Sequence, residues 1–386
     1  MAPHPIGPRR VVRLLLALTM LTLALAGCSS SAGAGSAPGH TKGASDAALS
    51  ALYRGRYGTP PSTAPKPRPG VKLWVLSCGA QSVGCTAVSQ AVVDAGHSLG
   101  WTVSVCDGKL DPGVWAGCLR SAVAAKADAL VQVAADCAAV RQPLSEARSA
   151  GLPVVGALSF DCGADGPSAL FSASVQMAEQ YPSLQSYAAA NGAARADWVA
   201  AKTDGRAKVI TVTAASSRIT KVQNDAFTTR LAKCRGCSVA EHVELTNEDL
   251  ATGKVRQKIE SALLRNPAAN ALATPADTFF TLGLQPAIMA SGRSGDLAVI
   301  GGEGDPPNFG FIAGNQGQDA TVAVPNGWVG WAAVDTVIRV LAKQRPVDEG
   351  IGFQVVDHDH MSAVSHGTYV PPVDYEAAYR TAWGLK

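Results

Sequence analysis

The chain has 386 residues, of which 47% are hydrophobic and only 6% aromatic, so it can bury a large core and has the length of two or three domains. Without the three arginines at positions 9, 10 and 13, 30 of the 33 basic residues remain, against 30 acidic ones. The body contains no run of basic residues, so composition and charge argue against a nucleic-acid-binding protein.

The first 27 residues have the pattern of a targeting segment. The three arginines precede an apolar run of 14 residues, 14–27, which stops at Cys28. A membrane-spanning helix takes about 20 residues, so we expect an export signal instead. The sequence Leu25-Ala26-Gly27-Cys28 resembles the lipobox of bacterial lipoproteins. This resemblance implies cleavage before Cys28 and lipidation of its thiol; the alternative is an ordinary secretory signal followed by an unrelated cysteine.

Residues 28–70 are rich in Ser, Ala, Gly and Pro, with Pro60-Pro61 and three further prolines near the end. Such a composition buries too little apolar surface to order itself, so we expect a disordered tether. Its r.m.s. reach would be roughly 35 Å. One short helix at residues 47–57 is the only regular element expected within it.

Short apolar strands and helices alternate over residues 71–162. This pattern predicts right-handed βαβ units, and hence a parallel sheet covered by helices on both faces. The expected strands span residues 71–77, 102–105, 129–133 and 153–158, with helices at 86–99 and 113–126 and a third helix that ends near Gly151. Residues 170–174 are expected to form a fifth extended segment.

The same alternation returns in the second half of the chain. We predict strands at residues 208–213, 238–245, 271–273, 297–300 and 320–324, and helices at 184–202, 220–232, 249–264 and 277–291. The strands end in small, polar or cysteine residues, and open parallel sheets bind ligands at the carboxyl ends of their strands. Two such α/β lobes would place a small-molecule site between them.

Eight cysteines remain after Cys28, an even number that indicates disulfides in an exported protein. Eight cysteines allow 105 pairings, and the predicted elements favour the sequential one. That pairing joins Cys78 to Cys85, Cys106 to Cys118, Cys137 to Cys162, and Cys234 to Cys237. The alternative for the last pair is a redox-active Cys-x-x-Cys motif, but that motif normally opens a helix, whereas here it follows one.

The order of these elements carries a family resemblance. The motifs are Gly151-Leu152-Pro153-Val154-Val155, Gly301-Gly302-Glu303-Gly304-Asp305 and Ala320-Thr321-Val322-Ala323-Val324-Pro325. In order and spacing the chain is similar, over about residues 71–355, to the type I periplasmic sugar-binding proteins of the ribose- and galactose-binding group. The resemblance implies two Rossmann-like α/β lobes with parallel sheets, and chain crossings near residues 174, 325 and 353. Lobe 1 would then comprise residues 71–174 and 325–352, and lobe 2 residues 175–324 and 353–386.

The resemblance also implies a set of ligand contacts. Polar and charged candidates lie at the expected strand ends and suit sugar hydroxyls, which both donate and accept hydrogen bonds. They are Ser77, Gln81, Ser159, Asp161, Arg218, Asp277 and Glu303. Asp161 could instead cap a loop, and Asp277 could be the N-cap of the helix that follows it.

Aromatic residues supply candidate stacking surfaces for the apolar face of a sugar, and we expect one or two of them to touch ligand. They are Trp115, Phe160, Phe279, Phe309 and Trp328. The sequence Asp357-His358-Asp359-His360 looks like a metal cluster, but alternate residues of a strand point to opposite faces, so we expect no metal and no cofactor.

Three functions fit these observations. The first is a lipid-anchored, monomeric solute-binding protein on the outer face of the cell membrane that passes a small polar ligand, by family resemblance a sugar, to an ABC permease. The second is a ligand-sensing subunit of a membrane receptor or kinase. The third is a secreted α/β enzyme, which the lack of a G-x-S-x-G elbow, an H-E-x-x-H helix and a phosphate-binding loop disfavours.

Overall fold

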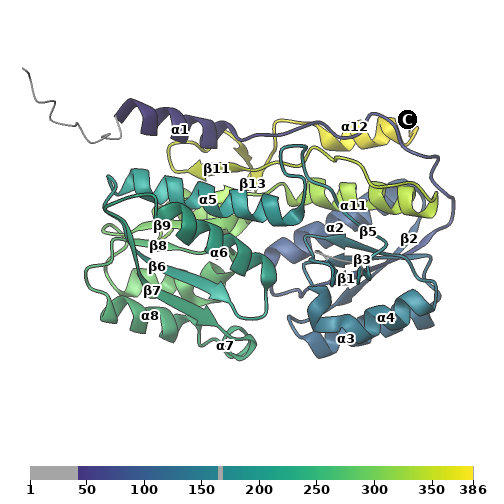
Figure 1. Cartoon of the computed structure of the whole chain (residues 1–386), viewed down its shortest axis with the longest axis horizontal. Coiled ribbons are helices and arrows are strands. Elements are labelled where there is room, and N and C mark those ends of the chain that lie inside the picture. Colours follow the sequence, from purple (N-terminus) through teal and green to yellow (C-terminus); the bar gives the residue numbers. More distant parts are fainter. Residues whose placement is uncertain (1–41, 164–167, 386) are drawn as a thin grey trace, which may run out of the picture. The chain divides into compact units, whose positions relative to one another are not determined.

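The computed structural model describes residues 42–163 and 168–385 (Figure 1). The expected signal segment, Cys28 and the start of the expected tether lie outside these residues. Two sheets organise the described chain, one of five strands in the order β2-β1-β3-β4-β5 and one of six in the order β11-β10-β9-β8-β6-β7. We call the parts built on them lobe 1 and lobe 2.

The sheet of lobe 1 is parallel throughout, as its apolar runs predict. Its strands are β1 (Lys72–Ser77), β2 (Thr102–Asp107), β3 (Ala129–Val133), β4 (Val154–Ala157) and β5 (Ala173–Ser174). The helices between them are α2 (Val83–Ser98), α3 (Pro112–Ala124), the short η1 (Cys137–Val140) and α4 (Arg141–Ser149). Ser82 and Asp111 cap α2 and α3 by accepting hydrogen bonds from the first helical turn, which fixes where these helices begin.

The sheet of lobe 2 is parallel except for its last strand, β11, which runs antiparallel to β10. Its strands are β6 (Lys208–Ala214), β7 (Ser238–Leu245), β8 (Ala271–Ala273), β9 (Ala298–Glu303), β10 (Ala320–Ala323) and β11 (Gln354–Asp357). The helices α5 (Leu184–Lys202) and α6 (Arg218–Leu231) pack against each other over this sheet (Figure 1). The predicted α5, β7 and β8 have the observed bounds.

Two helices of lobe 2 differ from the prediction, and glycines explain both differences. The helix expected at 249–264 is divided into α7 (Asn247–Thr252) and α8 (Val255–Arg265) at Gly253, which is left-handed at φ 73°. The helix expected at 277–291 becomes a π-helical turn, η2 (Phe280–Leu284), followed by α9 (Gln285–Ala290). Gly283 has φ 139°, and a Cβ there would lie 2.8 Å from the backbone nitrogen of Arg256, so only glycine fits this close approach.

Three segments link the two sheets, and the C-terminal residues then return to lobe 1. The chain leaves the first sheet after β5, returns after β10 to form α11 (Asn326–Leu341), which packs on α2 and β4, and enters the second sheet again at β11. We expected the C-terminal residues to stay in lobe 2. Instead α12 (Tyr375–Ala382) packs on α11, because the rings of Tyr379 and Trp383 stack on Trp331.

The segment before β1 also differs from the expectation of a disordered tether. Residues 42–54 form the helix α1 (Lys42–Arg54), and the chain from residue 55 to 69 lies along the body. The Trp101 indole donates to the carbonyl of Arg68 at 2.8 Å, and Arg339 donates to that of Thr63 at 2.7 Å. Side chains of the body thus satisfy backbone groups of a proline-rich segment that cannot form regular structure of its own.

All four predicted disulfides are present, each joining cysteines that are consecutive in the sequence. Three of them lie in lobe 1 at the carboxyl ends of its strands.

Among the described residues, none of the helices combines the length and the hydrophobicity that crossing a membrane requires.

Candidate functional site

The carboxyl ends of the two sheets face each other and touch at three places. The hydroxyl groups of Ser82 and Thr278 lie 3.2 Å apart. A Cβ added to Gly84 would lie 3.6 Å from the carboxylate carbon of Glu303. At the third place Arg218 reaches across to lobe 1. Each contact joins the start of a helix or the end of a strand in one lobe to its counterpart in the other.

Arg218 makes the most extensive of these contacts. It is the first residue of α6; its backbone N–H donates to Asp136 at 2.8 Å, and its guanidinium lies 4.5 Å from the ring centroid of Phe160. Asp136 also accepts a hydrogen bond from the N–H of Phe160. Burial raises the pKa of Asp136, although both of these hydrogen bonds act in the opposite direction. The structure thus brings together the predicted contacts Phe160 and Arg218.

Asp136 was not among the predicted contacts, although it follows the third strand of lobe 1. Its position after an apolar strand was visible in the sequence, in the same way as that of Asp161. What the sequence lacks is the information that a helix of the other lobe, α6, begins against it.

The predicted contacts Ser159 and Asp161 bond to backbone groups of lobe 1, Ser159 to the end of β3 and the loop after it, and Asp161 to its own loop. The buried hydroxyl of Ser159 accepts from the N–H of Ala135 and donates to the carbonyl of Gln132 at 3.0 Å. Asp161 accepts backbone hydrogen bonds from Cys162 at 2.6 Å and Leu170 at 2.8 Å. The loop-capping role considered for Asp161 is therefore the observed one.

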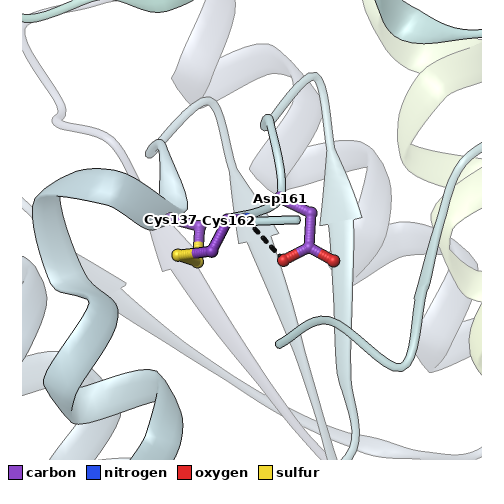
Figure 2. A group of neighbouring side chains, drawn as sticks. All are labelled: Cys137, Asp161 and Cys162. Carbon is purple, nitrogen blue, oxygen red and sulfur yellow. Dashed lines mark hydrogen bonds between the residues drawn. A yellow bond between two sulfur atoms is a disulfide. The ribbon is translucent and has the colours of Figure 1, made fainter. Parts of the chain in front are cut away.

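Figure 2 shows Asp161 next to the disulfide of Cys137 and Cys162. The carboxylate and the two sulfurs lie within 4.8 Å of one another, the spacing of a metal site. Because the sulfurs are bonded to each other, neither is a thiolate that could ligate a metal ion. This group closes a loop instead.

Asp277 is fully buried and lies at the centre of a hydrogen-bonded network in lobe 2. One oxygen accepts from the N–H of Gly304 at 2.8 Å and from the hydroxyl of Thr321 at 2.7 Å, and the other accepts from the amide of Gln318 at 2.9 Å. Burial raises its pKa to about 6 even with these donors. The carboxylate fixes the loops after β8 and β9, so it shapes the site and has few free lone pairs for a ligand.

Glu303, the last residue of β9, and Asp305, just after it, add two further acidic groups. The carboxylate of Glu303 accepts from the N–H of Asp277 at 3.1 Å and faces Gly84 of lobe 1. Asp305 is 1% exposed, and neither of its carboxylate oxygens has a hydrogen-bond partner. Burial, and then the neighbouring acidic groups, raises the pKa of both residues well above the usual range.

One buried cation lies near these acids. Arg195 of α5 is 1% exposed and donates to the carbonyl of Thr274 at 3.1 Å. Burial lowers its pKa to about 9, while the charges of Asp277 and Glu303 act in the opposite direction. Arg195 lies in the alanine-rich helix that was predicted only as a structural element, and no signal in its sequence neighbourhood marks it.

The remaining predicted contacts are divided between the rim and the core. Ser77 is buried at the end of β1, and Gln81 is exposed in the turn before α2. Phe279 is 4% exposed and belongs to the core of lobe 2. Trp328 is fully buried, where it stacks between Tyr57 and Tyr375, so it packs the helices and presents no free face.

The residues of the Asp-His-Asp-His motif lie away from this rim, at the end of β11. Asp357 accepts hydrogen bonds from Tyr53 at 2.6 Å and His360 at 2.7 Å, and it pairs with Lys202 at 3.1 Å. A shallow cavity of about 220 Å³ beside it is lined by Trp198, Asp319 and His358 among others. Asp357 is thus occupied by side chains of the protein itself.

A family model described as a periplasmic binding protein domain matches residues 75–345. With its two α/β lobes, three linking segments and opposed polar strand ends, the chain belongs to the periplasmic binding protein family, in its type I architecture. A search of curated protein sequences gave no significant match.

Solved structures show the same fold at low sequence identity. The binding-protein component of the arabinose ABC transporter from Shewanella sp. ANA-3, bound to L-arabinofuranose, is 20% identical; the match covers 82% of this chain and 98% of that one, with a TM-score of 0.63. A glucose-galactose binding protein from Geobacillus stearothermophilus is 16% identical, with 76% and 100% coverage and a TM-score of 0.65. A protein from Mycobacterium smegmatis in complex with β-D-fucofuranose is 16% identical, with 82% and 98% coverage and a TM-score of 0.64.

Proposed function

We propose that this protein is an extracytoplasmic solute-binding protein that captures a small polar ligand, a sugar, between its lobes and delivers it to an ABC permease. The observation that carries the proposal is the direct contact of the two polar rims, through Ser82 with Thr278 and through Arg218 with Phe160 and Asp136. Groups that meet across a hinge are positioned to hold a ligand from both sides when the lobes close.

The chemistry of the rim favours a ligand rich in hydroxyl groups. Glu303 offers acceptors, the Arg218 guanidinium offers donors, and the hydroxyls of Ser82 and Thr278 offer both. The Arg218 guanidinium lies over the ring of Phe160, which is only 4% exposed, so Arg218 and not the ring presents the surface that a ligand would meet here. Of the structural neighbours named above, two hold furanoses and the third is a glucose-galactose binding protein, which supports a sugar for this chain too.

Membrane attachment through a lipid on Cys28 is the second part of the proposal. The lipobox-like sequence before Cys28 and the four disulfides both favour a location outside the cytoplasm. An anchored binding protein stays near its permease, which then receives the closed, loaded form.

A thermal-shift screen tests the ligand. The mature chain, with its disulfides intact, is heated with pentoses, hexoses, cyclitols, nucleosides and amino acids. At 100 times its dissociation constant a ligand stabilises the folded state by about 2.7 kcal/mol, which raises the midpoint by several degrees. We expect a sugar to produce this shift.

Two matched variants link the shift to the rim. Glu303→Gln keeps the shape and one acceptor of the side chain but replaces its second oxygen with an amide donor, and should abolish or strongly reduce the shift. Glu244→Gln removes an exposed carboxylate of the edge strand β7 and should leave it unchanged. If no sugar shifts the midpoint, or if both variants respond alike to the ligand, the proposed sugar site is wrong.

A further inference from the structure

The end of α1 and the segment that follows it run along the hinge, and we call residues 53–69 the strap. At its start, Tyr53 donates to Asp357 of lobe 2 at 2.6 Å, and its ring stacks on His360 with centroids 3.5 Å apart. At its end, Arg68 forms an ion pair with Asp128 of lobe 1 at 3.7 Å and accepts the indole hydrogen bond of Trp101. The strap therefore has one attachment in each lobe.

Between these attachments the strap pairs with the segments that link the lobes. Arg56 forms an antiparallel bridge with Phe353, and the N–H of Gly58 donates to the carbonyl of Gly350 at 2.9 Å. The linking segment that contains Gly350 and Phe353 also pairs with the linking segment that follows β5, since the N–H of Ala178 donates to the carbonyl of Ile351 at 3.0 Å. The strap also reaches the first linking segment, since the side chain of Gln180 donates to the carbonyl of Arg56 at 3.2 Å, so it is bonded to two of the segments that link the lobes.

Glycines allow this pairing to be unusually close. A Cβ on Gly352 would lie 1.8 Å from the carbonyl oxygen of Arg56, and one on Gly350 would lie 2.6 Å from backbone atoms of Thr59. Gly350 also has φ 76°, where a larger residue is strained. Two glycines of the hinge segment therefore leave room for the backbone of the strap and for no other group.

Tyr57 connects the strap to both lobes at once. Its ring stacks with Trp328 at the start of α11 in lobe 1, with centroids 6.3 Å apart. Its hydroxyl bonds to that of Tyr369, and donates to Gln354 of β11 in lobe 2 at 3.3 Å. Burial raises the pKa of Tyr57, so the hydroxyl stays protonated and can donate.

We infer that the strap restrains the hinge and limits how far the lobes open. Hinge motion in two-lobed proteins changes backbone dihedrals in the linking segments. Here those segments are hydrogen-bonded to a chain that is itself attached to both lobes, so wide opening must break contacts of the strap. The closed arrangement of the rims is then favoured before any ligand contributes to it.

The test measures lobe opening directly and needs no ligand, so its outcome is independent of the proposed sugar site. Two fluorophores are attached through a genetically encoded keto amino acid at Ala138 in lobe 1 and Glu248 in lobe 2, both exposed near the strand ends. The recognition site of a sequence-specific protease is inserted between Pro61 and Ser62, and single-molecule energy transfer is recorded before and after cleavage. We expect cleavage to increase the population with the longer distance roughly five-fold or more. This is the change expected when the closed state loses the free energy of about one hydrogen bond.

A matched control has the same protease site after Asp204, an exposed turn within lobe 2, and cleavage there should leave the distances unchanged. Should the chain cut in the strap unfold, Tyr57→Phe and Tyr53→Phe replace it, because each removes hydroxyl hydrogen bonds and keeps the ring. Each should increase the open population in the same direction. Identical distance distributions in the folded cut chain or in both tyrosine variants, or an equal change in the Asp204 control, would overturn the inference.

Discussion

The carboxylate of Asp305 is buried without a hydrogen-bond partner, next to the acidic side chains of Asp277 and Glu303. The pKa of each of the three is raised, so the folded state holds their protons more tightly than the unfolded state does. The free energy of unfolding must therefore fall as the pH rises from about 4, the ordinary aspartate pKa, through the raised values. Because the groups interact, this loss belongs to the three together.

Asp305→Asn should reduce that loss. The amide keeps the shape of the side chain and removes a charge that has no partner, so we expect the variant to be more stable than the wild type by about 1–3 kcal/mol at pH 7.5 and nearly equal to it at pH 4.5. Denaturant unfolding at the two pH values measures this. The Lys258 hydrogen bond lowers the pKa of Asp249 to about 2. The titration of Asp249 therefore changes the free energy of unfolding only below pH 4.5 and does not affect this comparison.

Asp296→Asn serves as the control, because Asp296 is exposed and its replacement should change neither value. A variant at position 305 that is less stable than the wild type at pH 7.5 would contradict the argument.

Each disulfide closes a loop of a different length. Loop length determines how much a disulfide stabilises the elements that it joins. Cys137–Cys162 joins the loops after β3 and β4 with a separation of 25 residues, whereas Cys234–Cys237 spans 3 residues in one turn. On chain entropy alone, removing the first should lower the free energy of unfolding by about 3.5 kcal/mol and the second by about 1.6 kcal/mol.

Paired Cys→Ser variants of each disulfide, unfolded in denaturant, check this order. A larger loss for the Cys234–Cys237 pair would mean that native contacts of the turn, and not closure of the loop, determine its contribution.

The sequence predicts elements well where one local pattern dominates. The apolar runs of β1, β3 and β8 are unambiguous, and α5 has the observed bounds. Prediction from the sequence fails where the conformation of a segment depends on contacts with a distant part of the chain. Gly283 adopts its conformation because the backbone of Arg256 lies against it, and α12 packs on lobe 1 because α11 presents Trp331. Neither neighbour is close in the sequence.

The candidate site follows the same rule. The rim could be predicted because polar residues after parallel strands converge at one edge, and Phe160, Arg218 and Glu303 do lie where the lobes meet. Which carboxylate is free could not be predicted. Asp161 is used by its own loop and Asp277 by the loops around it, while Asp136 meets Arg218 only when both lobes are assembled.

For the whole molecule, the contact of Arg218 with Phe160 should help to hold the lobes together. A cation–π interaction contributes about 0.5–2 kcal/mol, so Arg218→Ala should increase the ratio of open to closed molecules by roughly 2- to 30-fold. Energy transfer between labels in the two lobes measures this ratio without ligand.

Arg230→Ala is the matched control, since Arg230 lies in the same helix α6 and pairs with Asp197 inside lobe 2. The two variants should differ; an equal opening in both, or none in either, would show that Arg218 does not hold the lobes together.

Because α1 and the strap pack on the body, the part of the chain that can act as a membrane tether is shorter than predicted. A tether of residues 29–70 would allow the lobes to move over a wide volume. Between Cys28 and the first described helix, however, there are only 13 residues. Such a chain spans at most about 50 Å even when fully extended. A lipid on Cys28 would therefore confine the protein to a thin layer above the bilayer, and the local concentration of loaded protein at a permease in that bilayer would be correspondingly high.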